Sequence, residues 1–163
     1  MPRPFEASLA GQIPGRLLKC LNQNAVRYEI LHEPLDPTPP GRRSAATGLI
    51  ETAVLRAGDR RLLVVMPAEQ NIDLKRFARL IGEAVRLETE DEFKWLFPDC
   101  ALGAIPPFGN LYGLSTWVDK SVAKTEQICF FAGTRNDSIK IAYSAYADIV
   151  RPNLGVFSGK GLS

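Results

Sequence analysis

Apolar residues along this chain recur at two spacings, one typical of helices and one typical of strands. Leu17, Leu18 and Leu21 share one face at helical spacing. Residues 62–66 (LLVVM) are apolar throughout, as in a strand buried on both faces. Over the whole chain the pattern predicts helices at 16–24, 74–81, 90–97 and 145–150. It predicts strands at 26–31, 52–56, 62–66, 111–118, 126–132 and 138–143.

Capping residues mark where several of these helices begin and end. Asp73 is a suitable N-cap for the helix at 74–81, and a glycine at its C-terminal end, Gly82, is a suitable C-cap. Thr89 precedes the next helix, with Glu92 at the reciprocal position of a capping box. Ser144 is the predicted cap of the last helix. These signals place four residue-level boundaries that a structure can check.

Helices and strands are mixed without the regular alternation of a doubly wound sheet. We therefore predict an α/β (mixed α+β) fold: a single compact domain with a mixed, largely antiparallel sheet flanked by helices. A length of 163 residues suits one domain. The expected organisation is an N-terminal arm (1–15), the domain itself (16–157) and a flexible tail (158–163).

Charge, cysteine spacing and apolar runs argue against some classes of protein and leave others open. The net charge of +2 neither requires nor excludes a nucleic-acid partner, for which Arg42–Arg43 and Arg60–Arg61 are candidate contacts. The three cysteines are far apart and form no C-x-x-C pair, which argues against a disulfide framework and a structural zinc site. We expect no metal and no cofactor, because there is one histidine and no phosphate-binding glycine motif. The chain has no apolar run of membrane-spanning length and no signal-peptide pattern, so we expect a cytoplasmic protein without a membrane partner.

The most distinctive segment is 103–119, GAIPPFGNLYGLSTWVD. Pro106 and Pro107 fix two φ angles and remove two backbone donors. Gly103 and Gly109 permit backbone conformations that side chains disfavour. From these residues alone, the segment is either a tight connection between strands or a loop that presents its main chain to a ligand. His32, at a predicted strand end, is either a site residue or a residue at the rim of one.

The order of residues in this segment resembles the glycine–proline loop of the YbaK/prolyl-tRNA-synthetase-associated domain family. The similarity covers about residues 16–157. It extends to RYEILHEP, to the hairpin and helix of ETAVLRAGDRRLLVVMPAEQNIDLKRFARLIG, and to the last strands and helix of ICFFAGTRNDSIKIAYSAYADIV. The PPFGNLYGL and FFAGT pieces carry most of its specificity.

Members of that family are aminoacyl-tRNA editing deacylases, which hydrolyse the ester that joins a wrong amino acid to the 3′ end of tRNA. The resemblance therefore implies a tRNA 3′ end as partner, with a synthetase as a further candidate partner. It implies that backbone groups of the loop hold the aminoacyl moiety while the terminal ribose hydroxyl of the substrate helps to activate water. The substrate-binding residues carried over to this chain are His32, Thr52, Gly103, Pro107, Phe108, Gly109, Gly133 and Thr134.

Two positions depart from the family pattern. Glu51 stands where members carry a lysine before the threonine, and Arg135 stands where members often carry a histidine after A-G-T. In one reading Glu51 and Arg135 form a compensating pair across the pocket, and Arg135 binds phosphate. In the other reading the chain is catalytically degenerate and acts as a tRNA- or small-ligand-binding or regulatory module. A shifted alignment is the third explanation. The oligomeric state stays open.

Overall fold

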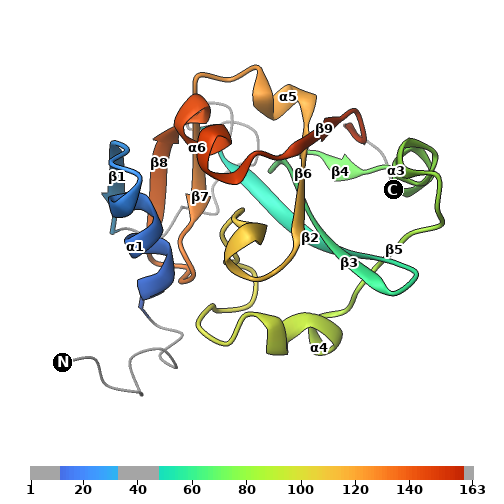
Figure 1. The fold of residues 1–163 in the computed structure, drawn as a ribbon, viewed down its shortest axis with the longest axis horizontal. Helices are drawn as coiled ribbons and strands as arrows, with labels where there is room; N and C mark the ends of the chain where they lie inside the picture. The colour runs from blue at the N-terminus through green and yellow to red at the C-terminus, as the bar shows by residue number, and fades with distance from the viewer. Residues whose placement is uncertain (1–11, 33–47, 160–163) are drawn as a thin grey trace.

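The computed structural model describes residues 12–32 and 48–159, and their strands form two main sheets that lie side by side (Figure 1). The larger sheet has the order β5-β2-β3-β6-β9. Its strands are β2 (Ile50–Ala57), β3 (Arg60–Pro67), β5 (Arg86–Leu87), β6 (Ser115–Asp119) and β9 (Asn153–Gly155). The smaller sheet has the order β1-β8-β7, with β1 (Tyr28–Leu31), β7 (Gln127–Phe131) and β8 (Ser138–Ala142). A third pair joins β4 (Asn71–Ile72) to β10 (Ser158–Gly159).

The strand directions confirm the predicted fold class of a mixed, largely antiparallel α/β domain. β2 is antiparallel to β3 and to β5, and the three-stranded sheet is antiparallel throughout. Only the pairs of β6 with β3 and β9 are parallel in these sheets. The expectation of one sheet is too simple, because the strands divide into separate sheets. An isolated parallel bridge between Leu49 and Cys129 connects the start of β2 with β7.

The helices cover the sheets, and their predicted caps are mostly confirmed. They are α1 (Gly15–Gln23), α3 (Leu74–Ile81), α4 (Glu90–Phe93), α5 (Lys120–Ala123), α6 (Tyr143–Val150) and the 3₁₀ turns η2 (Lys94–Leu96) and η3 (Gly109–Leu111). The Asp73 carboxylate accepts from the Arg76 N–H, Gly82 has φ +77°, and Thr89 with Glu92 forms the full capping box. The predicted cap Ser144 is wrong, since α6 begins at Tyr143 and no side chain caps it.

Two predicted elements differ from the sequence pattern by more than two residues at one end. The helix expected at 90–97 ends its α-helical part at Phe93 and continues as a 3₁₀ turn. The strand expected at 111–118 begins only at Ser115, because η3 and Gly113, with φ +75°, turn the chain first. Leu111 and Leu114 pack as apolar turn residues, which mimic a strand pattern.

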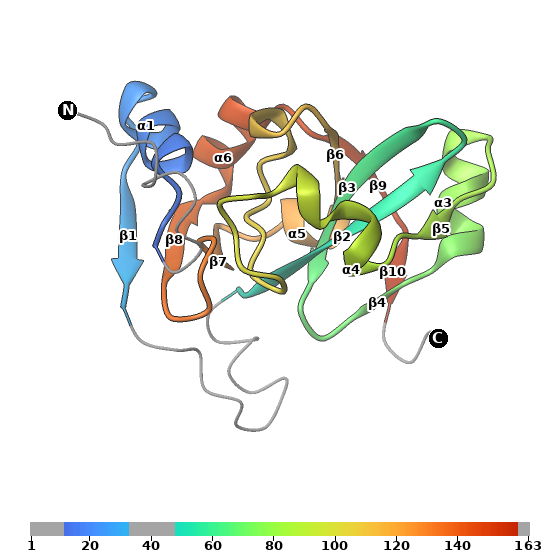
Figure 2. The same ribbon diagram turned by 90° about the horizontal axis from the view of Figure 1, so that it is seen from below.

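The hydrophobic core consists of three clusters. One lies between α1, α6 and the three-stranded sheet and includes Phe108 and Phe130. A second lies beneath α3, where Phe77 contacts the rings of Trp117 and Phe157 edge-on. The third packs beside the loop that precedes β6 and includes Phe97. Figure 2 shows that this loop runs between the two sheets, so it is supported from both sides.

Ordered packing extends past both predicted domain boundaries. Ile13 packs against the first cluster, and Pro14 lies against Gly133, although both fall in the expected arm. Ser158 and Gly159, in the expected flexible tail, pair with β4. The remainder of the arm (1–11) and of the tail (160–163) lies outside the described residues, as does Arg42–Arg43. In the described part of the chain, no helix has the length and apolar character needed to cross a membrane.

Candidate functional site

A cavity of about 230 Å³ lies where the two sheets meet the loop before β6. Its walls come from the first half of β2, the loop residues Gly103 and Ile105, the end of β7, and α4. Eleven residues line it: Ile50, Glu51, Thr52, Ala53, Val54, Glu90, Phe93, Gly103, Ile105, Phe130 and Phe131. Three of the ten predicted site residues belong to this lining: Glu51, Thr52 and Gly103. A fourth, Arg135, lies next to Gly103.

The cavity follows an open edge of β2. The Leu49 C=O accepts from the Ala68 N–H on the β3 side, and the Val54 C=O accepts from the Glu88 N–H on the opposite side. In an antiparallel ladder the hydrogen-bonding direction alternates with each residue. Thr52 therefore directs its backbone N–H and C=O away from β3, as Val54 does. Because β5 pairs only with Leu55 and Arg56, these Thr52 groups face the cavity.

Hydrogen bonds hold the loop against this edge. The Thr52 hydroxyl donates to the Ile105 C=O at 3.2 Å. From the other sheet, the Gly133 N–H donates to the Ala104 C=O and the Gly133 C=O accepts from the Ala101 N–H, both at 2.8 Å. Gly133 has φ +85°. Thr52 and Gly133 thus position the cavity loop, and Thr52 alone of the two also lines the cavity.

The second half of the glycine–proline loop, which the resemblance assigns to substrate binding, does not line this cavity. Phe108 is fully buried between the rings of Phe130 and Tyr146, with centroids 5.5 and 5.3 Å away. The Pro107 C=O accepts from the Tyr146 hydroxyl at 2.6 Å. The Gly109 N–H donates to the hydroxyl of Thr116 on β6 at 3.0 Å. These residues anchor the loop in the core, because their apolar and backbone groups are satisfied there.

Arg135 lies beside the cavity through its contact with Gly103. A Cβ at position 103, where φ is +83°, would lie 2.5 Å from Nη1 of Arg135. The Arg135 side chain is exposed. Within 12–32 and 48–159, Glu51 and Arg135 form no ion pair, so the structure does not show the compensating pair that one reading of the sequence offers. The two charges lie at the same site but act separately.

Glu51 is an isolated carboxylate at the cavity. Partial desolvation at the cavity raises the pKa of the Glu51 carboxyl, and no cation within 12–32 and 48–159 counteracts this. Glu90, on α4, is a second carboxylate in the lining, and neither forms an ion pair among the described residues. Phe93, Phe130 and Phe131 complete an acidic and aromatic wall.

Sequence reasoning missed Glu90 and the three phenylalanines, because a capped helix and a core strand give no local signal of a cavity.

The other predicted site residues lie outside the lining. His32 Nδ1 is 2.7 Å from Oδ1 of Asp137 at the turn between β7 and β8, and the His32 side chain is largely exposed. The Thr134 hydroxyl is buried and accepts from the Asn136 N–H, which shapes the same turn. The turn that carries Arg135 is therefore built by its own polar contacts. No group of three or more His, Cys, Asp or Glu residues in the described part could hold a metal ion.

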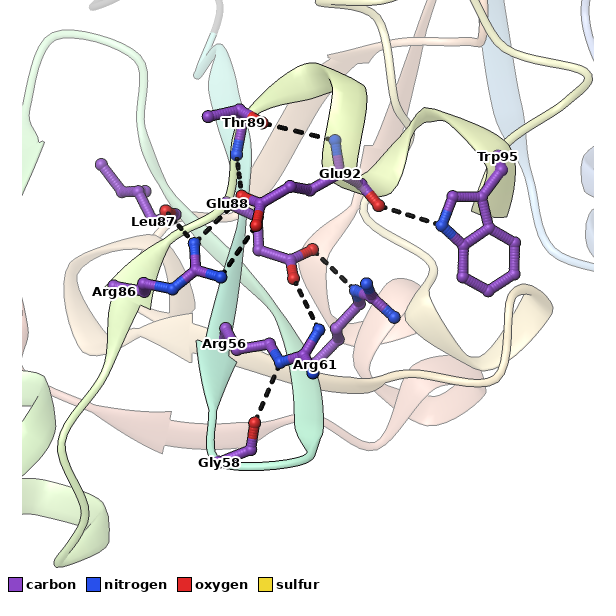
Figure 3. Close-up of polar contacts among 9 residues, drawn as sticks. All are labelled: Arg56, Gly58, Arg61, Arg86, Leu87, Glu88, Thr89, Glu92 and Trp95. Atoms are coloured by element: carbon purple, nitrogen blue, oxygen red, sulfur yellow. Dashed lines mark hydrogen bonds and ion pairs between the residues drawn. The ribbon is translucent and has the colours of Figure 1, made fainter.

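A separate ion network beside α4 includes Arg61 of the Arg60–Arg61 pair that the sequence singles out (Figure 3). The fully buried Glu88 carboxylate accepts from Arg56 at 3.2 Å and from Arg61 at 2.7 Å. Arg60 pairs with Glu83, and Arg61 also lies 5.4 Å from the ring centroid of Trp95. Each of these arginines pairs with a carboxylate of the protein, and Arg56 and Arg61 share the single negative charge of Glu88.

Comparisons with known proteins agree with this architecture. The family model for the aminoacyl-tRNA editing domain matches residues 42–149. Among solved structures, a provisionally described trans-editing enzyme for prolyl-tRNA synthetase has a TM-score of 0.71 and 16% identity, covering 98% of this chain and 99% of that one. The hypothetical protein APE2540 has a TM-score of 0.75 and 16% identity, covering 88% of this chain and 99% of that one.

A protein from Marinobacter aquaeolei VT8, provisionally assigned to signal transduction, has a TM-score of 0.74 and 16% identity. The match covers 90% of this chain, which spans 31% of that longer protein. Identities this low show the shared fold. A search of proteins with curated descriptions finds no match. The family match covers most of the chain and includes β2, the cavity loop and β7, and on this ground the chain belongs to the aminoacyl-tRNA editing domain family.

Proposed function

We propose that this domain binds the aminoacyl 3′ end of tRNA and hydrolyses the ester of a mischarged amino acid. Water adds to the ester carbonyl, the bond to the ribose oxygen breaks, and free amino acid and tRNA result. The observation that carries the proposal is the cavity at the open edge of β2, in the region that matches the editing family. The Thr52 N–H is a donor that a developing oxyanion can use.

The cavity lining offers no side-chain nucleophile with a base. Thr52 supplies the lining's hydroxyl, which is already donating to the Ile105 C=O. The residues of this chain therefore bind and orient the ester, and the attacking group is water, assisted by the ribose hydroxyl of the substrate. Preorganised backbone dipoles can stabilise such a transition state without covalent catalysis.

The charge of the lining favours the amino acid over a phosphate in the cavity itself. Glu51 and Glu90 are carboxylates, and the phenylalanine faces of the wall also attract cations. We infer that they receive the α-ammonium group of a small amino acid, since about 230 Å³ is less than drug-sized sites occupy. Exposed Arg135, at the Gly103 side, is our candidate for the tRNA phosphate.

A non-catalytic binding module is the second candidate. The unpaired Glu51 favours it, because a negative charge there repels a phosphate that the family lysine would attract. In either case the resemblance to a trans-editing protein for prolyl-tRNA synthetase points to proline tRNA, in the cytoplasm, with a synthetase as a candidate partner.

The test is a deacylation assay with alanyl-, cysteinyl- and seryl-tRNA charged on proline tRNA. Hydrolysis of any of them above the uncatalysed rate supports the deacylase. Binding of these tRNAs without hydrolysis supports the second candidate. Glu51→Lys tests whether the charge at this position determines deacylase activity. Activity in this variant alone would identify the natural chain as a degenerate enzyme. Loss of an existing activity in the variant would show that Glu51 has a role of its own. Glu126→Lys, an equal charge reversal at an exposed residue that does not line the cavity, is the matched control.

A further inference from the structure

Arg16, on the first turn of α1, contacts both ends of the cavity loop. Its Nε donates to Oδ2 of Asp99 at 2.8 Å, and its Nη1 donates to the Leu111 C=O at 3.0 Å. Residues 100–110 lie between these two contacts and include Gly103 and Ile105 of the cavity wall. One guanidinium thus ties together two points that are 12 positions apart in the chain.

Tyr112 and Cys100 complete a closed network around this contact. The Arg16 guanidinium carbon lies 4.5 Å from the Tyr112 ring centroid. The Tyr112 hydroxyl donates to Oδ1 of Asp99 at 3.1 Å and lies 3.3 Å from Sγ of Cys100. Burial raises the pKa of the Cys100 thiol to about 12 and that of Tyr112 still further, so both are neutral. Arg16 is the cation that compensates the Asp99 carboxylate, which is 4% exposed.

The surroundings of α1 show why this contact bears on the cavity. Pro14, two residues before Arg16, lies against Gly133, whose N–H and C=O hold Ala104 and Ala101 of the same loop. The other anchors are neutral hydrogen bonds, from Thr52 on β2, from Gly133 after β7 and from Tyr146 on α6. Among the described residues, Arg16–Asp99 is the charged anchor, and it comes from α1. The Asp99 carboxylate would be costly to bury without a cation beside it. Removal of the Arg16 guanidinium should therefore draw water toward Asp99 and the loop.

We propose that Arg16 is a positioning residue: by joining Asp99 to Leu111 it holds the cavity loop closed against β2. The activity part of this inference rests on the proposed function; the structural part does not. Without Arg16, residues 100–110 open locally while both sheets remain folded. Cys100 reports on this opening directly, since its thiol is 7% exposed and belongs to the network.

The experiment measures thiol alkylation under native conditions, resolved by residue with mass spectrometry. Arg16→Met should speed alkylation of Cys100 about tenfold, the factor for 1.4 kcal/mol of local stability, with fully buried Cys129 unchanged. Arg16→Lys should give an intermediate rate of Cys100 alkylation, because lysine keeps the positive charge but lacks the planar set of donors of the guanidinium. Arg56→Met, which removes a similar bond to the buried Glu88 in the separate network of Figure 3, should leave the rate of Cys100 alkylation unchanged.

Asp99→Asn should also speed Cys100 alkylation. In the double variant with Arg16→Met, the rate should rise by less than the product of the two single rate increases. Equal acceleration of Cys100 and Cys129 in Arg16→Met would overturn the inference, because it reports global unfolding. A Cys100 rate equal to that of the parent protein would also overturn it. In an active protein, Arg16→Met should lower kcat/KM while Arg56→Met does not. An inactive parent protein refutes the proposed function and leaves the alkylation test intact.

Discussion

The Arg135 guanidinium occupies the space that a side chain at Gly103 would need. Nη1 lies 2.5 Å from the position of a Cβ at residue 103, and Gly103 has a φ of +83°, which glycine adopts most readily. The positive φ and the position of Arg135 therefore both favour glycine at residue 103. The arginine side chain, of a type that binds phosphate, thus lies beside Gly103 of the cavity wall and forms no ion pair with Glu51.

Gly103→Ala should destabilise the protein by more than backbone strain alone. An alanine in the left-handed region costs about 1–2 kcal/mol, and the added Cβ would also displace Arg135. Gly113→Ala is the matched control, since Gly113 has φ +75° and no atom within 4 Å of an added Cβ. Urea unfolding of both variants measures the difference. Equal losses would show that Arg135 yields freely and that the contact is not a constraint.

Phe108→Ala should lower the free energy of unfolding by about 3–5 kcal/mol, as for other buried phenylalanines. The reason is the lost packing against Phe130 and Tyr146 in the first core cluster. Thermal unfolding monitored by circular dichroism measures the loss. Exposed Trp95→Ala, at 63% exposure, is the control and should have a small effect. A stable Phe108→Ala protein with a selective loss of ligand binding would restore Phe108 to the site.

Asp119 should make stability depend on acid pH. Burial alone would raise its pKa, but hydrogen bonds from Phe157, Ser121 and Ser158 outweigh it and lower the pKa of this carboxyl. A lowered pKa contributes stability above the unfolded value of about 3.9 that is lost as the pH falls through the folded value. Asp119→Asn should therefore be less stable at pH 7 and approach the parent protein below pH 4.

Guanidinium chloride unfolding of the two proteins at several pH values measures this convergence. Asp148→Asn, at an exposed position of α6, should follow the parent protein at every pH. A constant gap between the parent protein and Asp119→Asn would contradict the assignment to the carboxylate charge.

The Glu88 network should be strongly non-additive. Arg56→Met or Arg61→Met alone leaves the buried carboxylate with one cation. Removal of both leaves an uncompensated buried charge, for which about 3–5 kcal/mol is typical. The double variant should thus lose more than the sum of the single losses in a double-mutant cycle. Adding Glu88→Gln should restore part of the stability, and no restoration would mean that packing, not charge, is responsible.

Glu51→Gln should slightly stabilise the protein at neutral pH. Because burial raises the pKa of Glu51, the folded state favours the neutral carboxyl below the unfolded pKa and loses that advantage as the pH rises through the folded value. Glutamine removes the charge, so its gain should appear at pH 7 and vanish at acid pH. Since the residue is exposed, we expect about 0.5 kcal/mol or less. Calorimetric melting curves measure the gain, and a loss at pH 7 would indicate an unseen cation partner.

Local signals explain why much of the fold was predictable. Asp73, Gly82 and the Thr89–Glu92 capping box set helix ends through contacts between residues close in sequence, so their positions were correct. The apolar run at 62–66 required burial on both faces, and β3 has it. Local signals failed at Ser144, where no side chain caps α6, and at Leu111, where a 3₁₀ turn stands in place of the strand.

The order of residues along the chain was enough to identify the family, most of the helix caps and the loop of glycines and prolines. Tertiary structure decided which part of that loop serves the cavity. Gly103 and Ile105 line it, while Phe108 is buried in the core. It also decided that Glu51 and Arg135 do not pair and that Arg16 reaches Asp99 across 83 positions. The physical reason is that charge pairing and cavity walls depend on distances between elements remote in the chain, which local spacing does not encode.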